Sequence, residues 1–186
     1  MKFSRNPKSG ILEAYTDDGV YQGEIYTFED YVLEKEERKK RPFNMDMITK
    51  MQLITENGCS GPCPKPDDEV EQRLTITENG RVYLSRYRFG KGFGEFELIG
   101  KQLFKIPYER AEELLDAVGE YFSKENRIEY VTDVGTWKLT LTDFVGKKYK
   151  AEGTLWADLM TSRGGLSEML RRYLGIDDLF AFDGNR

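Results

Sequence analysis

The stretch that decides the fold is PYERAEELLDAVGEYFS, residues 107–123. Its apolar residues recur at steps of three and four, which places them on one stripe of a helix: Tyr108, Ala111, Leu114, Leu115, Val118 and Phe122. Pro107 suits the first helical turn, where a missing N–H costs nothing. Burying each large apolar side chain contributes roughly 1.5–3 kcal/mol before entropy is subtracted. The stripe needs a partner surface, and flanking strand-like segments predict that this surface is a sheet.

Strands are predicted on both sides of this helix. Alternation of apolar and polar residues indicates strands over 74–77, 82–89, 128–132, 137–142 and 148–155, and one or two over 96–106. On the strand after the Asn79-Gly80 turn, Val82 and Leu84 share one face, and the other face holds Tyr83, Ser85, Tyr87 and Phe89. A second helix is predicted over 166–174, followed by Gly175, and a final short strand over 179–185. The pattern predicts an α+β fold, an antiparallel β-sheet built from hairpins with two amphipathic helices packed on one face.

The first third of the chain is patterned less regularly. Strands are predicted over 11–15 and 20–26, around the turn Asp17-Asp18-Gly19, and over 45–55. Residues 27–40 fit a capped helix or a strand, and we favour a strand followed by a charged turn or short helix. The proline-containing residues 58–68 are the best linker candidate. We therefore divide the chain into a mainly β segment, residues 1–66, and an α+β domain, residues 67–186, which either fold separately or form one domain.

The pentapeptide Ile-Thr-Glu-Asn-Gly occurs twice, at 54–58 and 76–80. Asn-Gly supplies the positive φ angles that a two-residue hairpin turn requires. We prefer two hairpin turns to a duplicated unit, because the residues that follow the two copies differ.

Composition excludes several kinds of chemistry. The chain has no histidine, which excludes imidazole general bases and zinc sites that need histidine, and its two cysteines cannot form a four-thiolate zinc site. A net charge of -5 gives no overall attraction to phosphate backbones. No apolar run approaches the roughly 20 residues that span a bilayer, and no apolar leader is visible. We expect a soluble, cytoplasmic protein, although a removed signal segment would leave the same pattern.

Residues 71–186 contain three further patterns. They are Leu74-Thr75-Ile76 before an Asn-Gly turn, DVGTWKLTLT over 133–142, and LGIDDLF over 174–180 running into FDGN at 182–185. In these patterns the segment resembles an uncharacterised family of small bacterial proteins. The resemblance implies a shared fold, and because the family has no known activity it leaves the function open.

Candidate binding residues surround a glycine-rich loop. Lys91-Gly92-Phe93-Gly94 matches the start of the octamer on the RNA-stacking strand of an RRM. Basic and aromatic residues interleave in the set we select: Tyr83, Arg86, Tyr87, Arg88, Phe89 and Phe93. Glu95 then stands where an aromatic residue belongs, and residues 74–91 are too few for a strand and a helix. We therefore interpret the loop as a hairpin connection and expect weak or no RNA affinity.

Two other patterns have a structural and a functional interpretation. Cys59 and Cys63 are spaced C-x₃-C, unlike the C-x-x-C of redox sites, which favours reduced loop thiols over a small-loop disulfide in an exported protein. Acidic groups at 17–18, 67–69 and 177–178 fit turns and helix ends, where aspartate bonds locally. Phe180 and Phe182 stand where a calcium loop would need ligands.

No nucleophile, base and metal set is visible, so we expect a non-catalytic binding or interaction module without cofactor, metal or membrane contact. An unknown protein partner is the expected ligand, bound at the open tyrosine-rich face that Tyr83, Tyr87 and Phe89 share. The alternative is a small-ligand binder or enzyme that uses carboxylates, Tyr or Lys in a cleft that only the fold assembles. Weak single-stranded nucleic-acid binding ranks third.

Overall fold

The chain forms two compact units, Met1–Pro42 and Phe43–Arg186. The structure, a computed structural model, describes residues 2–5, 12–25, 42–57, 63–124 and 131–184. This division differs from the boundary after residue 66 that the sequence suggests, because residues 43–66 contain strand β4 (Ile48–Glu56), a central strand of the second unit's sheet. The linker-like composition of 58–68 thus belongs to a connection within one sheet.

The first unit contains a three-stranded antiparallel sheet in the order β1-β2-β3. Strands β2 (Leu12–Tyr15) and β3 (Tyr21–Ile25) confirm the two expected strands, and the N–H of Gly19 closes their turn on the carbonyl of Thr16 at 3.0 Å. Strand β1 (Lys2–Arg5) was not predicted and pairs with β2. The ambiguous segment 27–40 lies outside the described residues.

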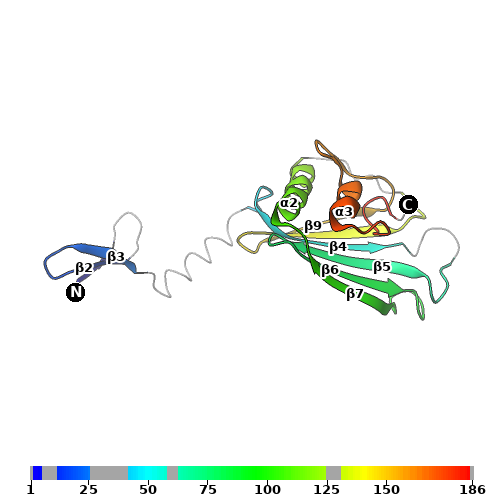
Figure 1. Cartoon of the computed structure of the whole chain (residues 1–186), viewed down its shortest axis with the longest axis horizontal. Coiled ribbons are helices and arrows are strands. Elements are labelled where there is room, and N and C mark those ends of the chain that lie inside the picture. The colour runs from blue at the N-terminus through cyan, green and yellow to red at the C-terminus, as the bar shows by residue number, and fades with distance from the viewer. Residues whose placement is uncertain (1, 6–11, 26–41, 58–62, 125–130, 185–186) are drawn as a thin grey trace. The chain divides into compact units, whose positions relative to one another are not determined.

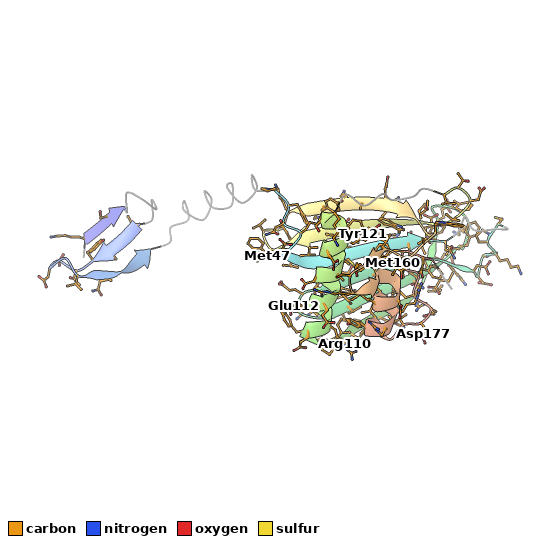
Figure 2. All side chains as sticks on the ribbon, turned by 90° about the horizontal axis from the view of Figure 1, so that it is seen from above. Met47, Arg110, Glu112, Tyr121, Met160 and Asp177 are labelled. Atoms are coloured by element: carbon orange, nitrogen blue, oxygen red, sulfur yellow. The ribbon has the colours of Figure 1, made fainter. Side chains whose placement is uncertain are left out.

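The second unit confirms the predicted α+β class. Its six-stranded antiparallel sheet has the order β7-β6-β5-β4-β8-β9. The strands beside β4 are β5 (Glu69–Thr77), β6 (Arg81–Arg88), β7 (Glu97–Lys105), β8 (Thr136–Asp143) and β9 (Lys148–Thr154). Helices α2 (Tyr108–Ser123) and α3 (Leu166–Leu174) contact each other and cover one face of the sheet (Figures 1 and 2). A small ribbon of β10 (Met160–Thr161) and β11 (Gly164–Gly165) leads into α3.

Helix α2 has the expected bounds and buries the expected stripe. Ala111, Leu114, Leu115, Val118 and Phe122 are all buried. Tyr108, the first residue of α2, is the exception and is 54% exposed. The stripe packs into a core in which the rings of Trp137 and Phe182 meet edge-on, with centroids 5.2 Å apart.

The turn between β5 and β6 is where predicted, but its type differs. The N–H of Gly80 donates to the carbonyl of Thr77 at 2.9 Å, and Gly80 has a φ of 78°. Among the described non-glycine residues only Asp133 has a positive φ, so Asn79 does not adopt the left-handed conformation of a two-residue turn. The connection has three residues with glycine at the left-handed position. After Asn57 the next strand begins only at Glu69, so the first pentapeptide is not followed by a tight hairpin, and Gly58 lies outside the described residues.

The C-terminal residues are buried, but they do not form the expected strand. Residues 176–184 run in turns with a single bridge between Ala181 and Gly184. Side chains satisfy their backbone instead: the amide oxygen of Gln72 accepts the N–H of Phe180 at 2.9 Å, and the Nε of Arg171 donates to the carbonyl of Leu179 at 3.0 Å. Part of another expected strand, residues 128–130, lies outside the described residues, and residues 131–132 are not in a strand.

Candidate binding face of the sheet

The face of the sheet opposite α2 and α3, here called the open face, is covered by no other described element of the second unit. Residues directly opposite each other in an antiparallel sheet share a face, so the pairing registers define this face in rows across the strands. One row is Leu103, Tyr83, Thr75, Gln52, Thr140 and Lys150, and the next is Lys101, Ser85, Arg73, Ile54, Lys138 and Glu152.

The open face is basic although the chain is acidic. Its cationic residues are Lys50, Arg73, Arg81, Lys101, Lys105, Lys138, Lys148 and Lys150, and its acidic residues are Glu56, Glu71 and Glu152. Eight cations against three carboxylates leave five net positive charges, while the whole chain carries -5. The rest of the chain therefore carries ten net negative charges. Such a separation favours approach of an acidic surface to the open face.

A shallow depression of about 370 Å³ lies near the middle of the open face. Its walls combine two cations, apolar groups and small hydroxyl or amide groups: Arg73, Lys138, Tyr83, Ile54, Gln52, Thr75, Ser85 and Thr140, with the strand at Leu74 beneath. No carboxylate lines it within the described residues. The depression can hold the end of one side chain from a partner, and its polar groups favour a carboxylate.

Arg73 is held in place by two neighbours on the open face. Its Nε donates to Glu71 at 2.7 Å, and its guanidinium lies 4.5 Å from the centre of the Tyr87 ring. The Arg73 side chain is still half exposed, and among the described residues its terminal amino groups make no hydrogen bond. A fixed guanidinium with free donors can bind an incoming carboxylate with little loss of side-chain entropy.

The residues selected from the sequence separate into three groups. Tyr83 and Tyr87 lie on the open face. Arg86 lies on the other face and binds Asp178 through two hydrogen bonds of 2.7 and 2.8 Å. These hydrogen bonds raise the pKa of Arg86 above its usual value and lower the pKa of Asp178 below its own. Arg88 pairs with Glu97 at 2.8 Å, and that hydrogen bond raises the pKa of Arg88. Both arginines are therefore occupied within the fold.

Phe89 was expected on the open face, but the structure buries it. It is 9% exposed, and its ring contacts those of Phe93 and Phe96 at centroid distances of 5.1 and 6.3 Å. The strand β6 ends at Arg88, so Phe89 begins the loop whose Phe93 and Phe96 rings pack against it. Phe93 is exposed in the loop, away from any strand.

Sequence reasoning missed the residues that make the open face basic. Lys138 and Lys101 sit on strands that are far apart in the sequence, and only the sheet order brings them onto one surface with Arg73. A local signal was present in β9, where Lys148 and Lys150 alternate with Tyr149 and Ala151. Cys63 is exposed, and Cys59 lies outside the described residues.

An acidic hollow of about 190 Å³ lies at the start of α2, away from the open face. Carboxylates from several segments surround it, together with an exposed tyrosine and apolar side chains: Asp46, Glu78, Glu112, Asp116, Tyr108, Met47, Ile48, Thr49, Leu115 and Phe144. Met47 and Glu112 lie at the same end of the unit in Figure 2. The negative charge of Glu112 is the main cause that raises the pKa of Tyr108.

Within the described ranges, no group of three or more His, Cys, Asp or Glu side chains is placed to hold a metal ion. Across the same residues, no helix has both the length and the apolar character needed to cross a membrane. No family model matches the chain, and no curated protein matches it.

Proposed function

We propose that the protein is a non-catalytic binding module whose open face receives a protein partner. The observation that carries this proposal is a wide sheet face with exposed apolar side chains on it, including Tyr83 at 41% and Leu103 at 68% exposure. Six strands spaced about 4.8 Å apart, each eight or so residues long, give a face of roughly 600–700 Å². A standard protein interface buries about 800 Å² per partner, so the dimensions suit a protein better than a small molecule.

The character of the residues supports binding without catalysis. Among the described residues that line the central depression there is no carboxylate to serve as a partner in proton transfer, and Glu152, which lies opposite Lys138 on β9, is outside this lining. Arg73 is committed to Glu71 and Tyr87. Tyrosine and arginine are enriched at the points of protein interfaces that contribute most to affinity. The open face therefore presents the Arg73 guanidinium in a fixed position, where it can bind a partner.

The test compares the wild type with two variant baits in an extract of the native host. One bait carries Tyr83→Ser with Leu103→Ser on the open face, and the matched control carries Tyr108→Ser with Phe144→Ser at the acidic hollow. A protein captured by the wild type and the control, but lost with the open-face variant, supports the proposal. Capture that is the same with all three baits contradicts it. Exposed substitutions change stability by about 0.5 kcal/mol or less, so both baits should remain folded.

The acidic hollow supports a second candidate function, the binding of a small cationic ligand. Carboxylates such as Glu112 and Asp116 would pair with a cation, and apolar walls such as Met47 would cover its hydrocarbon part. A thermal-shift screen of organic cations tests this function. A ligand at about 100 times its Kd adds about 2.7 kcal/mol, which raises Tm by roughly 5–11 °C for a domain of this size. A hit that persists in a Glu112→Gln, Asp116→Asn variant would contradict binding in this hollow.

A further inference from the structure

We propose that the partner presents an extended, acidic segment, which pairs with the outer edge of β7 as a seventh strand of the sheet. This inference rests on the proposed function, because it names the chemistry of the partner of the open face. It is carried by three features of β7 within the part of the chain that the structure describes: an unpaired backbone edge, exposed aliphatic side chains, and cationic residues without an ion-pair partner.

Strand β7 is nine residues long, and no strand among the described residues pairs with its outer edge. Within the described sheet β7 has β6 as its neighbour on one side and no strand on the other. The N–H of Ile106 donates to Gly80, which is on the β6 side. Backbone groups alternate in direction along a strand, so those of Lys101, Leu103 and Lys105 point away from β6. An edge with such groups is a template for strand addition.

The side chains of this edge are unusually apolar for an uncovered strand. Leu98, Ile99 and Leu103 are each between 46% and 68% exposed. The register shift beside Tyr87 places Leu98 opposite that residue, on the open face. Natural proteins protect long edge strands by covering them or by placing charges on them. An added strand would bury these aliphatic groups against its own apolar side chains.

The charges next to the edge need an acidic partner. Arg81 and Lys105 are directly opposite each other on β6 and β7, and Lys101 follows on the same face. Like charges in opposite positions destabilise a strand pair, and among the described residues no ion pair relieves this one. A carboxylate between Arg81 and Lys105 would remove the repulsion. Lys101 and Lys105 also disfavour pairing of β7 with the β7 strand of a second copy, because such pairing would bring lysines of the two copies close to each other.

A nucleic acid fits these features less well than a protein strand. Binding surfaces for single strands stack successive bases on several aromatic rings. On the open face Tyr87 is covered by the guanidinium of Arg73, which leaves Tyr83 as the exposed ring. The remaining apolar groups, such as Leu103, are aliphatic. The observations therefore favour an acidic polypeptide with apolar residues at alternate positions.

The first experiment measures fluorescence anisotropy of labelled probes titrated with the full chain. The probes are a peptide as long as β7 that alternates Glu with Leu or Val, the same peptide with Lys in place of Glu, and a short oligothymidylate. We expect the acidic peptide to bind, the basic peptide not to bind, and the affinity to fall as salt is added. Equal binding of the two peptides, no binding of either, or tighter binding of the oligothymidylate would overturn the inference.

Two variants locate the binding. Lys101→Glu with Lys105→Glu reverses two charges on β7, and Lys148→Glu with Lys150→Glu makes the same change on β9, at the opposite edge of the same face. The β7 variant should weaken binding of the acidic peptide by about tenfold or more, since close charge pairs across an interface are coupled at about this level. The β9 variant should change it by no more than about threefold. Equal losses would indicate attraction to the whole basic face and would refute docking at β7.

A modified probe tests strand pairing without altering the protein. The acidic peptide is N-methylated at every second residue, in either of the two possible alternations. A strand added to β7 uses the N–H groups of one alternation only, so one modified peptide should lose binding and the other should keep it. If both bind as well as the parent peptide, no strand pairing occurs.

The outcomes separate this inference from the function on which it rests. If no peptide binds, but the variant of Tyr83 and Leu103 still loses a captured protein, the open face is an interface whose partner has another chemistry. If the acidic peptide binds in the expected way while the baits show no difference, the edge of β7 binds acidic strands, but the function proposed for the open face fails.

Discussion

Replacing Gly119 with alanine tests how tightly helix α2 is fixed to the rest of the second unit. Gly119 is buried, and a Cβ added there would lie 2.3 Å from the carbonyl oxygen of Met45 and 3.2 Å from Cδ1 of Ile48. The contact at Met45 is with backbone, which cannot rotate away as a side chain can. That backbone is also tied down, because the N–H of Asn44 donates to the buried carboxylate of Asp143 at 3.3 Å.

Two opposing effects decide the size of the change. Alanine is more favourable than glycine inside a helix by about 0.8–1.0 kcal/mol. Extra volume in a packed core costs typically 1–3 kcal/mol, and a contact this short with fixed backbone belongs in the upper part of that range. We therefore expect the free energy of unfolding to fall by about 1–2 kcal/mol and Tm to fall by roughly 2–8 °C.

Calorimetry and urea denaturation measure this prediction, and Gly100→Ala provides the matched control. Gly100 lies in β7, and an added Cβ there would have no atom within 4 Å. The control should be unchanged or slightly more stable, because glycine weakens the interior of a strand by about 0.5–1 kcal/mol. A Gly119→Ala variant with an unchanged or higher Tm would refute the reasoning, since it would show that α2 can move away from Met45 at little cost.

Three further predictions concern stability and ionisation. Phe182→Ala removes a fully buried ring packed edge-on against a buried tryptophan and should lower the free energy of unfolding by about 3–5 kcal/mol in urea titrations. The carboxylate of Asp158 accepts the N–H groups of Ser167 and Glu168 at the start of α3, at 2.7 and 3.4 Å. Asp158→Ala should lower the free energy of unfolding by about 1 kcal/mol in the same titrations, and Asp158→Asn should give a value between those of the wild type and Asp158→Ala. Hydrogen bonds from Lys124 and then Ser162 lower the pKa of Glu120 from 4.5 to about 2. An NMR titration should find this pKa for Glu120 in the wild type and a higher pKa in Ser162→Ala. Because the pKa of Glu120 is lowered by folding, its ionised carboxylate stabilises the folded state above pH 4.5, and this contribution is lost as the pH falls towards 2.

The regular elements of the second unit could be predicted because their signals are local. The bounds of α2 and α3 follow from apolar spacing, and β8 follows from strict alternation between Trp137 and Leu141. The type of the turn at Asn79 could not be predicted, because the residue pair Asn-Gly suits more than one hairpin connection. The tail at 179–184 was correctly expected to dock, but its backbone partners are side chains such as Gln72, more than 100 residues away.

The candidate site depended on long-range pairing and was therefore largely hidden. Arg86 looked available in the sequence because its partner, Asp178, is 92 residues away. The basic character of the open face could not be predicted for the same reason. The net charge of -5 is a sum over the whole chain and does not indicate a surface of opposite sign. Tyr83 was found because the alternation within one strand is enough to place it, whereas Arg73 and Lys138 become neighbours only through the order of the strands.

The order of strands in the sheet also has a consequence for folding kinetics. Every junction of the described six-stranded sheet joins strands that are consecutive in the sequence, except the junction of β4 with β8. There Met51 lies opposite Leu141, so ninety positions of chain must be closed into a loop. The four consecutive strands β4 to β7 and the hairpin β8–β9 can each form early from local contacts. Pairing β4 with β8 should then limit the rate of folding. We expect Leu139→Ala, at this junction, to slow refolding in stopped-flow experiments, whereas Leu103→Ala, at the outer strand, should leave the refolding rate nearly unchanged.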